Sequence, residues 1–349
     1  MKSGSRDQKI KVAQVLAGAA QGGAENFYVR LTKGLQKSNK IEQQAFLRHH
    51  QHRLDALSAA GIPAHGFRFG HSLHLLDRRR YLQALKKYSP DIVMTWMNRA
   101  SKLTPKGPYQ LVCRLGHYYD LKYYRHADFW IGISRGICDH LIRGRMPAEK
   151  IFHIPNFADE TPVSPLPRDS FDTPADRPLL LAAGRLHVNK GFDTLLQALV
   201  EIPDTILWLA GSGPEEHALK QLCSDLGLDE RVRFLGWRDD VTALMRTADI
   251  FVCPSRHEGL GSIVMESWVH QCPIVATDSQ GPGELIEDGK TGLLTPIDQA
   301  EPLAEAIQSL LGDESFGVQL VENAEREYWE RYSEKVVVGQ YEDFYFNLS

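Results

Sequence analysis

The sequence of 349 residues contains little cysteine and no long apolar run. Its five cysteines stand singly without CxxC spacing, so we expect buried reduced thiols and neither a zinc site nor a disulfide framework. No apolar run approaches the roughly 20 residues that a membrane-spanning helix needs. The polar N-terminus, MKSGSRDQKI, lacks the apolar segment of a secretory signal. These absences favour a cytoplasmic location.

The fingerprint of a dinucleotide-binding turn is absent too. Neither half of the chain has GxGxxG followed by an acidic residue about 20 positions later, which disfavours a nicotinamide-dependent dehydrogenase. What is present is an ordinary globular composition, with 43% hydrophobic and 24% charged residues. A chain of this length suits two domains of roughly 150 residues each.

The net charge of −4 hides a division along the chain. Residues 1–160 contain 26 Lys and Arg against 12 Asp and Glu, a net charge of +14, which leaves −18 for residues 161–349. A basic half attracts phosphate-rich ligands or an anionic membrane surface. Alternatively, the opposite charges only help two domains to dock.

Short apolar runs alternate with amphipathic segments in both halves of the chain. The first run, KVAQVLAG, is followed by a glycine-rich turn and the helix-like ENFYVRLTKGLQK, and the pattern restarts at PLLLAAG with six short strands separated by helices. Such alternation predicts an α/β fold with two Rossmann-like, doubly wound parallel-sheet domains and a cleft between them.

The domain bounds follow from the same pattern. Residues 160–178 contain five prolines and are the best candidate for a linker. We therefore predict one domain over residues 1–165 and a second over residues 175–324. Residues 325–349 are expected to form a C-terminal helix that packs back onto the first domain.

A glycine-rich turn, AGAAQGGAEN, follows the opening strand and leads into a helix at about Ala24. Free backbone amides and the positive end of the helix dipole would face a negative group there. The glycines, which include Gly22 and Gly23, do not match GxGxxG, and glycine at a strand-to-helix turn is common in α/β proteins. Alone, this turn is a weak sign of a ligand site.

A second turn, SRHEGLGSIVMES, combines glycines with two glutamates. A helix should begin near Gly261 or Ser262, so the amides of Leu260, Gly261 and Ser262 would be free for a phosphate. Glu258 would lie in the loop at the strand ends and Glu266 about one turn into the helix, where carboxylates accept hydrogen bonds from sugar hydroxyls. Alternatively, both are surface glutamates that the helix dipole favours.

These turns belong to a longer pattern. The segments that carry it are QGGAE at 21–25, AAGRLHVNKG at 182–191, VRFLGWRDDVTALMRTADIFVCPS at 232–255, SRHEGLGSIVMES at 255–267 and PIVATDSQGPGELIEDGKTGLLTP at 273–296. In order and spacing they resemble the conserved segments of the retaining glycosyltransferases of family 4, the glycosyl transferases group 1. The likeness covers nearly the whole chain. It implies the GT-B architecture, with an acceptor-binding first domain and a second domain that binds a nucleotide-diphosphate sugar.

The resemblance assigns roles to particular residues. Arg185 and Lys190 would hold the donor diphosphate and neutralise the charge that builds on the leaving group, unless they only form a solvated loop. Glu266 would bind the ribose hydroxyls, and Glu258 would contact the transferred sugar. The remaining donor contacts would come from Gly22, Gly23, Leu260, Gly261 and Ser262 and, near the base, from Gly236, Trp237 and Arg238.

The resemblance also implies retention of the anomeric configuration without a divalent metal. The sequence has no DxD between strands of the kind that metal-dependent glycosyltransferases use, and its candidate carboxylates are not clustered as hard-cation ligands. No residue can be assigned as the nucleophile of a double displacement, which favours a front-face, ion-pair-like transfer. We expect no cofactor, and a UDP-sugar is favoured over a GDP-sugar as donor.

The acceptor side is marked by the segment RLGHYYDLKYYRH. Family members often place a histidine of the first domain near the transferred sugar, and His117 is the best match, with His126 as a competitor. Either residue can also be an ordinary loop histidine. The family more often has an acidic residue directly after the histidine, whereas here Tyr118 and Tyr119 precede Asp120. This departure argues against an acid/base role and leaves aromatic stacking on a sugar open.

Residues 71–88 have the pattern of a basic amphipathic helix. Its leucines and its cations are Leu73, Leu76, Leu82, Leu85, Arg78, Arg79, Arg80, Lys86 and Lys87. Such a helix can rest on an anionic membrane surface, or its leucines can be core and its charges solvated.

Taken with the basic first half, this helix suggests a glycan or lipid-linked acceptor and a role in assembling a bacterial surface polysaccharide or lipopolysaccharide. The protein would then be cytoplasmic, with a peripheral position on the inner face of the membrane, and would have no nucleic acid partner. The alternatives are a nucleotide-sugar 2-epimerase of the same architecture and a catalytically silent nucleotide-binding scaffold. Glycosylation of a small metabolite also stays open.

Overall fold

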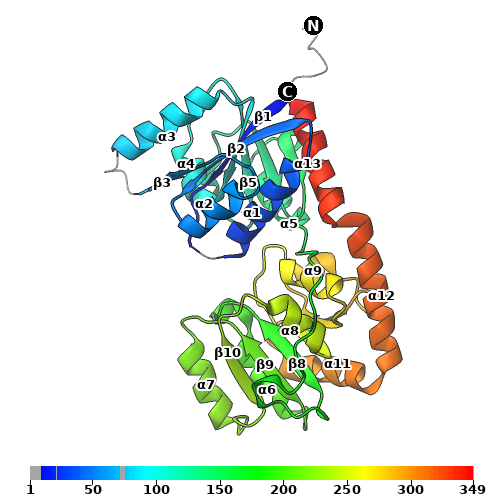
Figure 1. Ribbon diagram of the computed structural model, residues 1–349. Coiled ribbons are helices and arrows are strands. Elements are labelled where there is room, and N and C mark those ends of the chain that lie inside the picture. The colour runs from blue at the N-terminus through cyan, green and yellow to red at the C-terminus, as the bar shows by residue number, and fades with distance from the viewer. Residues whose placement is uncertain (1–8, 21, 71–74, 349) are drawn as a thin grey trace. The chain divides into compact units, whose positions relative to one another are not determined.

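Strands and helices alternate along the chain and build two α/β units in the computed structural model (Figure 1). The structure describes residues 9–20, 22–70 and 75–348. One unit consists of residues 1–157 and 334–349, and the other of residues 158–333. The chain thus passes from one unit to the other after Phe157 and returns after Ser333.

The first unit contains a seven-stranded parallel sheet with the order β3-β2-β1-β4-β5-β6-β7. The strands are β1 (Ile10–Leu16), β2 (Ile41–Arg48), β3 (Ala64–Phe67), β4 (Ile92–Trp96), β5 (Gln110–Leu115), β6 (Phe129–Gly132) and β7 (Ile151–His153). Central strands of a parallel sheet are covered on both faces, which is why β4 reads IVMTW with every residue buried.

Helices cover both faces of this sheet. They are α1 (Gly23–Gln36), α2 (Gln51–Ser58), α3 (Leu75–Tyr88), α4 (Met97–Leu103), α5 (Arg135–Arg143) and α13 (Glu334–Leu348). Successive strand residues point to opposite faces, so Ala45 joins the core that α1 and α13 share, whereas the ring of Phe46 lies 6.2 Å from that of Tyr81 on α3. The last helix, α13, packs beside α1 and buries Tyr341 and Tyr345 (Figure 1).

The second unit contains a six-stranded parallel sheet with the order β10-β9-β8-β11-β12-β13. The strands are β8 (Leu179–Ala183), β9 (Ile206–Ala210), β10 (Val232–Gly236), β11 (Ile250–Cys253), β12 (Ile274–Thr277) and β13 (Leu293–Thr295). From β8 the chain runs outward through β9 and β10, and it then returns to β11 on the other side of β8. The pair β8 and β11 is therefore the topological switch point, beside which ligands bind in such sheets.

The helices of the second unit connect these strands and close the unit. They are α6 (Phe192–Val200), α7 (Glu216–Asp225), α8 (Val241–Thr247), α9 (Ser262–Val269), α10 (Pro282–Leu285), α11 (Ala300–Gly312) and α12 (Glu314–Arg331). A single C-terminal helix was predicted from residue 325. In the structure α12 ends at Arg331 within the second unit, and α13 begins at Glu334 in the first.

Two findings bear on the predicted location and redox state. Among the described residues, no helix is long and apolar enough to cross a membrane. All five cysteines are free thiols and four of them are buried, so the prediction of reduced, buried cysteines is confirmed for those four, whereas Cys138 is partly exposed.

Candidate functional site

Two loops meet at the switch point of the second unit. One follows β8 and carries Arg185 and Lys190, and the other follows β11 and carries Glu258. Because β8 and β11 are neighbouring parallel strands, the loops after their carboxyl ends lie at the same edge of the sheet. The structure thus brings these three predicted residues to one edge, with Arg185 exposed and the other two partly buried.

An ion pair joins the two loops. The ammonium of Lys190, in the short helix η4 (Val188–Lys190), pairs with Oε1 of Glu258, and the hydroxyl of Ser255 donates to the same oxygen at 3.1 Å. The side chains are 24% and 16% exposed. Burial lowers the pKa of Lys190, but the Glu258 carboxylate and Cys253 together outweigh this effect, and the pKa lies above its ordinary value. Lys190 is therefore held as a cation.

The close approach of the two loops depends on Gly191. This residue has a φ of 62°, and a Cβ on it would lie 2.0 Å from the carbonyl oxygen of Pro254 at the end of β11. Any side chain would force the loops apart and would be strained in this left-handed conformation. Gly191 therefore allows Lys190 to reach Glu258.

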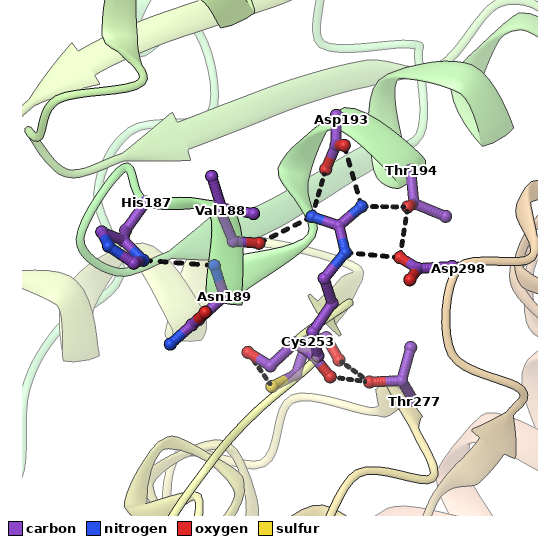
Figure 2. A network of polar contacts seen from close by, with 10 residues as sticks. His187, Val188, Asn189, Asp193, Thr194, Cys253, Thr277 and Asp298 are labelled. Atoms are coloured by element: carbon purple, nitrogen blue, oxygen red, sulfur yellow. Dashed lines mark hydrogen bonds and ion pairs between the residues drawn. The ribbon is translucent and has the colours of Figure 1, made fainter.

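Arg256 connects the loops more extensively than the ion pair does (Figure 2). Its guanidinium donates to both carboxylate oxygens of Asp193 at 2.9 and 2.8 Å and to the carbonyl of Val188 at 2.6 Å. Nε donates to Asp298 at 2.5 Å, and Nη2 lies 3.4 Å from the hydroxyl of Thr194. Arg256 thereby fixes the segment that precedes Lys190 to the start of α6 and to the loop after β13.

The backbone beside Arg256 strengthens this connection. The amide of Arg256 donates to the carbonyl of Asn189 at 2.8 Å, and the amide of His257 donates to the same oxygen at 3.3 Å. Asn189 directly precedes Lys190, and His257 directly precedes Glu258, so these bonds set the separation of the two charged groups. The sequence analysis assigned no role to Arg256. Its only indication of one was the position of Arg256 in SRHEG, two residues before Glu258.

The third part of this edge is the start of α9. Gly261 caps the helix with a φ of 73°, a left-handed conformation that favours glycine. Helix α9 begins directly after the loop that follows β11, so the positive end of its dipole lies near this edge of the sheet. Leu260 is buried, and Glu266 lies one turn into α9, where it is partly buried. A helix start beside Lys190 favours an anionic group.

Trp237 and Arg238 lie farther along the same edge. They follow β10, which is separated from β8 by β9. Trp237 is 53% exposed, whereas Arg238 donates two hydrogen bonds to Asp240 at 2.8 and 2.5 Å and stacks on the ring of Phe171. An exposed indole beside a fixed guanidinium offers a flat surface to a ligand.

The remaining predicted donor residues, Gly22 and Gly23, belong to the first unit. Gly22 caps α1, whose first residue is Gly23. The carboxylate of Glu25, which is 4% exposed, accepts a hydrogen bond from the amide of Ala19 at 2.7 Å and so fixes this loop from inside. The loop follows β1 at its boundary with β4, which is the switch point of this sheet.

His117 lies in the exposed loop after β5. Its Nδ1 accepts a hydrogen bond from the amide of Tyr118 at 2.8 Å, and because an amide can only donate, neutral His117 carries its proton on Nε2. His126 is fixed differently, since its Nε2 donates to the carbonyl of Thr104 at 2.9 Å. Tyr119 stacks on Tyr124, and its carbonyl accepts from His140.

The basic helix α3 combines a buried face with exposed cations. Tyr81, Leu85 and Tyr88 are buried, whereas Leu76 is 77% exposed. Its cations are all exposed: Arg78, Arg79, Arg80, Lys86 and Lys87. Leu82 is partly buried, and Leu73 lies outside the described residues. The predicted apolar face is therefore core at its C-terminal end, and Leu76 projects from the surface.

Acidic residues are not gathered for a metal in the described ranges. No group of three or more His, Cys, Asp and Glu side chains there is arranged to hold a metal ion. The charged groups at the switch point of the second unit are instead cations paired with carboxylates: Lys190 with Glu258, and Arg256 with Asp193 and Asp298. This arrangement suits an anionic organic ligand better than a hard cation.

Comparisons with known proteins agree on one family. The family model for glycosyl transferases group 1 matches residues 165–327. The lipopolysaccharide core biosynthesis glycosyltransferase LpsE of Rhizobium meliloti is 36% identical over 92% of this chain and 94% of its own length. LpsD of the same organism is 32% identical over 96% of this chain and 98% of its own length.

Solved structures share the fold. The structure of Anabaena HepE in complex with UDP-glucose superposes with a TM-score of 0.84 at 22% identity and covers 96% of this chain and 99% of its own. WaaG, a glycosyltransferase involved in lipopolysaccharide biosynthesis, gives a TM-score of 0.72 at 18% identity with the same coverage of 96% and 99%. These likenesses confirm the predicted GT-B fold of two parallel-sheet α/β domains.

Proposed function

The chain belongs to the group 1 glycosyltransferases, and on that basis we propose that it transfers a sugar from a nucleotide-diphosphate sugar to a hydroxyl of a glycan or lipid-linked acceptor. The transfer would retain the anomeric configuration and require no divalent metal. The observation that carries this proposal is the ion pair of Lys190 and Glu258 beside the start of α9, at the switch point of the second unit.

The geometry supports a division of labour at this edge. The Lys190 ammonium, the Arg185 guanidinium and the start of α9 would hold a diphosphate and would stabilise the charge of the leaving nucleotide diphosphate. Glu258 would then accept hydrogen bonds from the transferred sugar, and Glu266 from the ribose. Protein cations would take the part that a metal plays in other transferases.

The first unit would supply the acceptor side. With its proton on Nε2, His117 would donate a hydrogen bond to a sugar oxygen and would not take a proton there. This suits a front-face transfer in which the leaving diphosphate, and not the histidine, receives the acceptor proton. Gly22 and Gly23 would allow substrate to approach the backbone closely.

The donor and the pathway rest on the relatives. Anabaena HepE was solved in complex with UDP-glucose, which favours a UDP-sugar here. LpsE and LpsD are named for lipopolysaccharide core biosynthesis and match nearly the whole chain, so an acceptor of the lipopolysaccharide core is the best candidate. The exposed cations of α3 would hold the protein at the anionic inner face of the membrane. None of these relatives supports the 2-epimerase alternative.

A ligand screen tests the proposal. Purified protein with EDTA is assayed for thermal stabilisation and for slow hydrolysis of UDP-, GDP-, ADP- and TDP-sugars. Stabilisation by one nucleotide family, lost in Lys190→Ala and kept in Lys290→Ala, would support the donor site and name the base. Lys290 is a suitable control because it forms an exposed ion pair with Glu287 far along the chain. Absence of any response, with or without added metal, would overturn the proposal.

A further inference from the structure

A cluster of cationic and imidazole side chains lies beside the glycine loop of the first unit. The segment RHHQHR, residues 48–53, ends β2 and begins α2, and β2 is the neighbour of β1, which leads into the glycine loop. Its basic members are Arg48, His49, His50, His52 and Arg53. All of them belong to the first unit, and none is among the predicted donor contacts.

Arg53 is buried, and only one of its two terminal nitrogens donates hydrogen bonds to the described residues. It is 2% exposed, and its Nη2 donates to the carbonyls of Ala19 and Ala20 at 3.0 and 3.1 Å. No group among residues 9–20, 22–70 and 75–348 accepts a hydrogen bond from the buried Nη1. A buried guanidinium with an unused edge is unfavourable unless an acceptor arrives to complete it.

His50, which caps α2, repeats this situation. Its Nε2 is also buried and lacks a hydrogen-bond partner in the described part of the chain. Burial lowers the pKa of His50, the charges of Arg53, Arg48 and His52 lower it further, and only a contact with the backbone of Gly18 raises it. Because Gly18, Ala19 and Ala20 are consecutive, the imidazole and the guanidinium lie along the same stretch of loop.

The nearby carboxylate of Glu25 does not accept a hydrogen bond from Nη1 of Arg53. Glu25 accepts from the amide of Ala19, and a Cβ on Gly18 or Gly22 would lie only 2.4 or 2.3 Å from its carboxylate oxygens. Glu25 is therefore packed under the loop as a support for its backbone. Burial lowers the pKa of Arg53 even though Glu25 and Tyr28 act to raise it. These two groups therefore do not fully offset the cost of burying the charged guanidinium.

We propose that His50 and Arg53 form a subsite for an oxyanion, a phosphate or a carboxylate, carried by the acceptor. The planar edge of a guanidinium matches the oxygens of either group, and the imidazole beside it would add a second donor once the bound anion favours its protonation. The inference rests on the proposed function, since it assigns the acceptor a negative charge close to the glycine loop. It deepens that function by naming the class of acceptor: a phosphorylated or acidic sugar.

Histidine side-chain NMR tests the subsite in the full-length protein. Saturating UDP is added first, so that the donor site does not compete for the probe. The probes are glucose 6-phosphate, glucuronate and, as the neutral control, glucose, with sodium chloride at matched ionic strength. The Cε1–H signal of His50 is identified by its loss in His50→Gln.

We expect the His50 signal to move with glucose 6-phosphate, with glucuronate or with both, and not with glucose or salt. The anion that acts at the lower concentration identifies the group that the subsite takes. Arg53→Lys keeps the charge but loses the planar edge, so it should weaken binding by about tenfold, whereas Arg143→Gln on the exposed face of α5 should not.

Three results would overturn the inference: no movement of the His50 signal with either anion, an equal movement with salt, or equal weakening in Arg143→Gln. If Arg53→Lys does not fold, the response of the His50 signal to the probes in the wild-type protein still tests the subsite. The two proposals fail separately. Absence of UDP binding contradicts the proposed donor, whereas a silent His50 in protein that binds UDP contradicts only the subsite.

Discussion

Lys190 and Glu258 form an ion pair although they lie 68 positions apart in the sequence and on loops after different strands. In the proposed function each group also has a role of its own, since the cation would hold the diphosphate and the carboxylate would contact the sugar. The pair therefore keeps both side chains in place before substrate arrives. When a diphosphate binds, it would take over part of the charge on Lys190 and leave Glu258 for the sugar.

Glu258→Gln separates the two roles. The amide keeps the size of the side chain but cannot neutralise Lys190, so UDP should bind at least as tightly as in the wild-type protein, while transfer falls by about 100-fold or more. Calorimetry with UDP and initial rates of donor hydrolysis measure the two quantities. Glu287→Gln, which removes an exposed carboxylate of a surface ion pair, is the matched control. If UDP binding and the rate of transfer fell together in Glu258→Gln, the ion pair of Lys190 and Glu258 would have only a structural role.

Glu266→Ala should weaken the binding of nucleosides as well as of nucleotide sugars. Glu266 lies one turn into α9, where a carboxylate would accept two hydrogen bonds from ribose hydroxyls. A hydrogen bond to a charged group contributes about 1.5–3 kcal/mol, so the loss of even one of the two should raise Kd by about 10- to 100-fold. The measurement compares UDP with 2′,3′-dideoxy-UDP. Wild-type protein should bind UDP more tightly than the dideoxy analogue, and Glu266→Ala should not. An equal difference in both proteins would contradict a contact between Glu266 and the ribose.

Much of the fold could be predicted from local sequence. Continuous apolar runs such as IVMTW in β4 and LLLAA in β8 are typical of parallel strands covered on both faces, and the alternation with helices predicted two doubly wound sheets. For α3 the sequence left two interpretations open, leucines that face a membrane and leucines that belong to the core. In the structure Leu85 is buried with Tyr81 and Tyr88, whereas Leu76 is 77% exposed.

The role of Arg256 could not be predicted in the same way. Its partners Asp193 and Asp298 lie 63 and 42 positions away, and no local spacing connects them. The orphaned nitrogens of His50 and Arg53 likewise depend on the path of the glycine loop after β1. Such contacts exist only once separate strands have been brought to one sheet edge. Family motifs therefore identified side chains that would touch substrate and missed those that hold the loops.

Arg256→Lys tests that holding role. Lysine keeps the charge but cannot donate to both oxygens of Asp193 and to Val188 together, so the KM for the donor should rise by about tenfold while kcat changes less. The side chains of Asp193 and Asp298 are 45% and 54% exposed, so the loss of stability should be only about 1 kcal/mol. Arg246→Lys is the control, since Arg246 makes an exposed contact with Gln271. A purely structural role would lower the melting temperature without moving KM.

Acid should weaken the same network. Burial raises the pKa of Asp193, but the hydrogen bonds and charge of Arg256, together with backbone hydrogen bonds at the start of α6, outweigh this effect, and the pKa lies below its ordinary value of 3.8. A carboxyl with a lowered pKa stabilises the folded state above its ordinary value, and the contribution is lost as the pH falls through the folded pKa. The melting temperature of the wild-type protein should therefore fall more steeply below about pH 4 than that of Asp193→Asn. Parallel curves for the two proteins would contradict this assignment.

Charge reversal on α3 tests the proposed membrane contact. Arg78, Arg79 and Arg80 are exposed beside Leu76, whereas the packing of the helix depends on Tyr81, Leu85 and Tyr88, so the triple change to Glu should leave the fold intact. Each basic residue near an anionic surface contributes about 1 kcal/mol, so replacing three of them with acidic residues should weaken binding to phosphatidylglycerol vesicles by more than about 100-fold.

Vesicle sedimentation and circular dichroism measure binding and folding side by side. Vesicles of phosphatidylcholine should bind neither protein, and Arg143→Glu on α5 should leave binding to anionic vesicles within about twofold of wild type, because a single exposed charge away from the contact contributes little. Binding of the triple variant at the wild-type level would place the contact elsewhere on the basic first unit. The exposed leucine makes a further distinction: Leu76→Ser should weaken binding at high salt, where apolar insertion persists after the charges are screened.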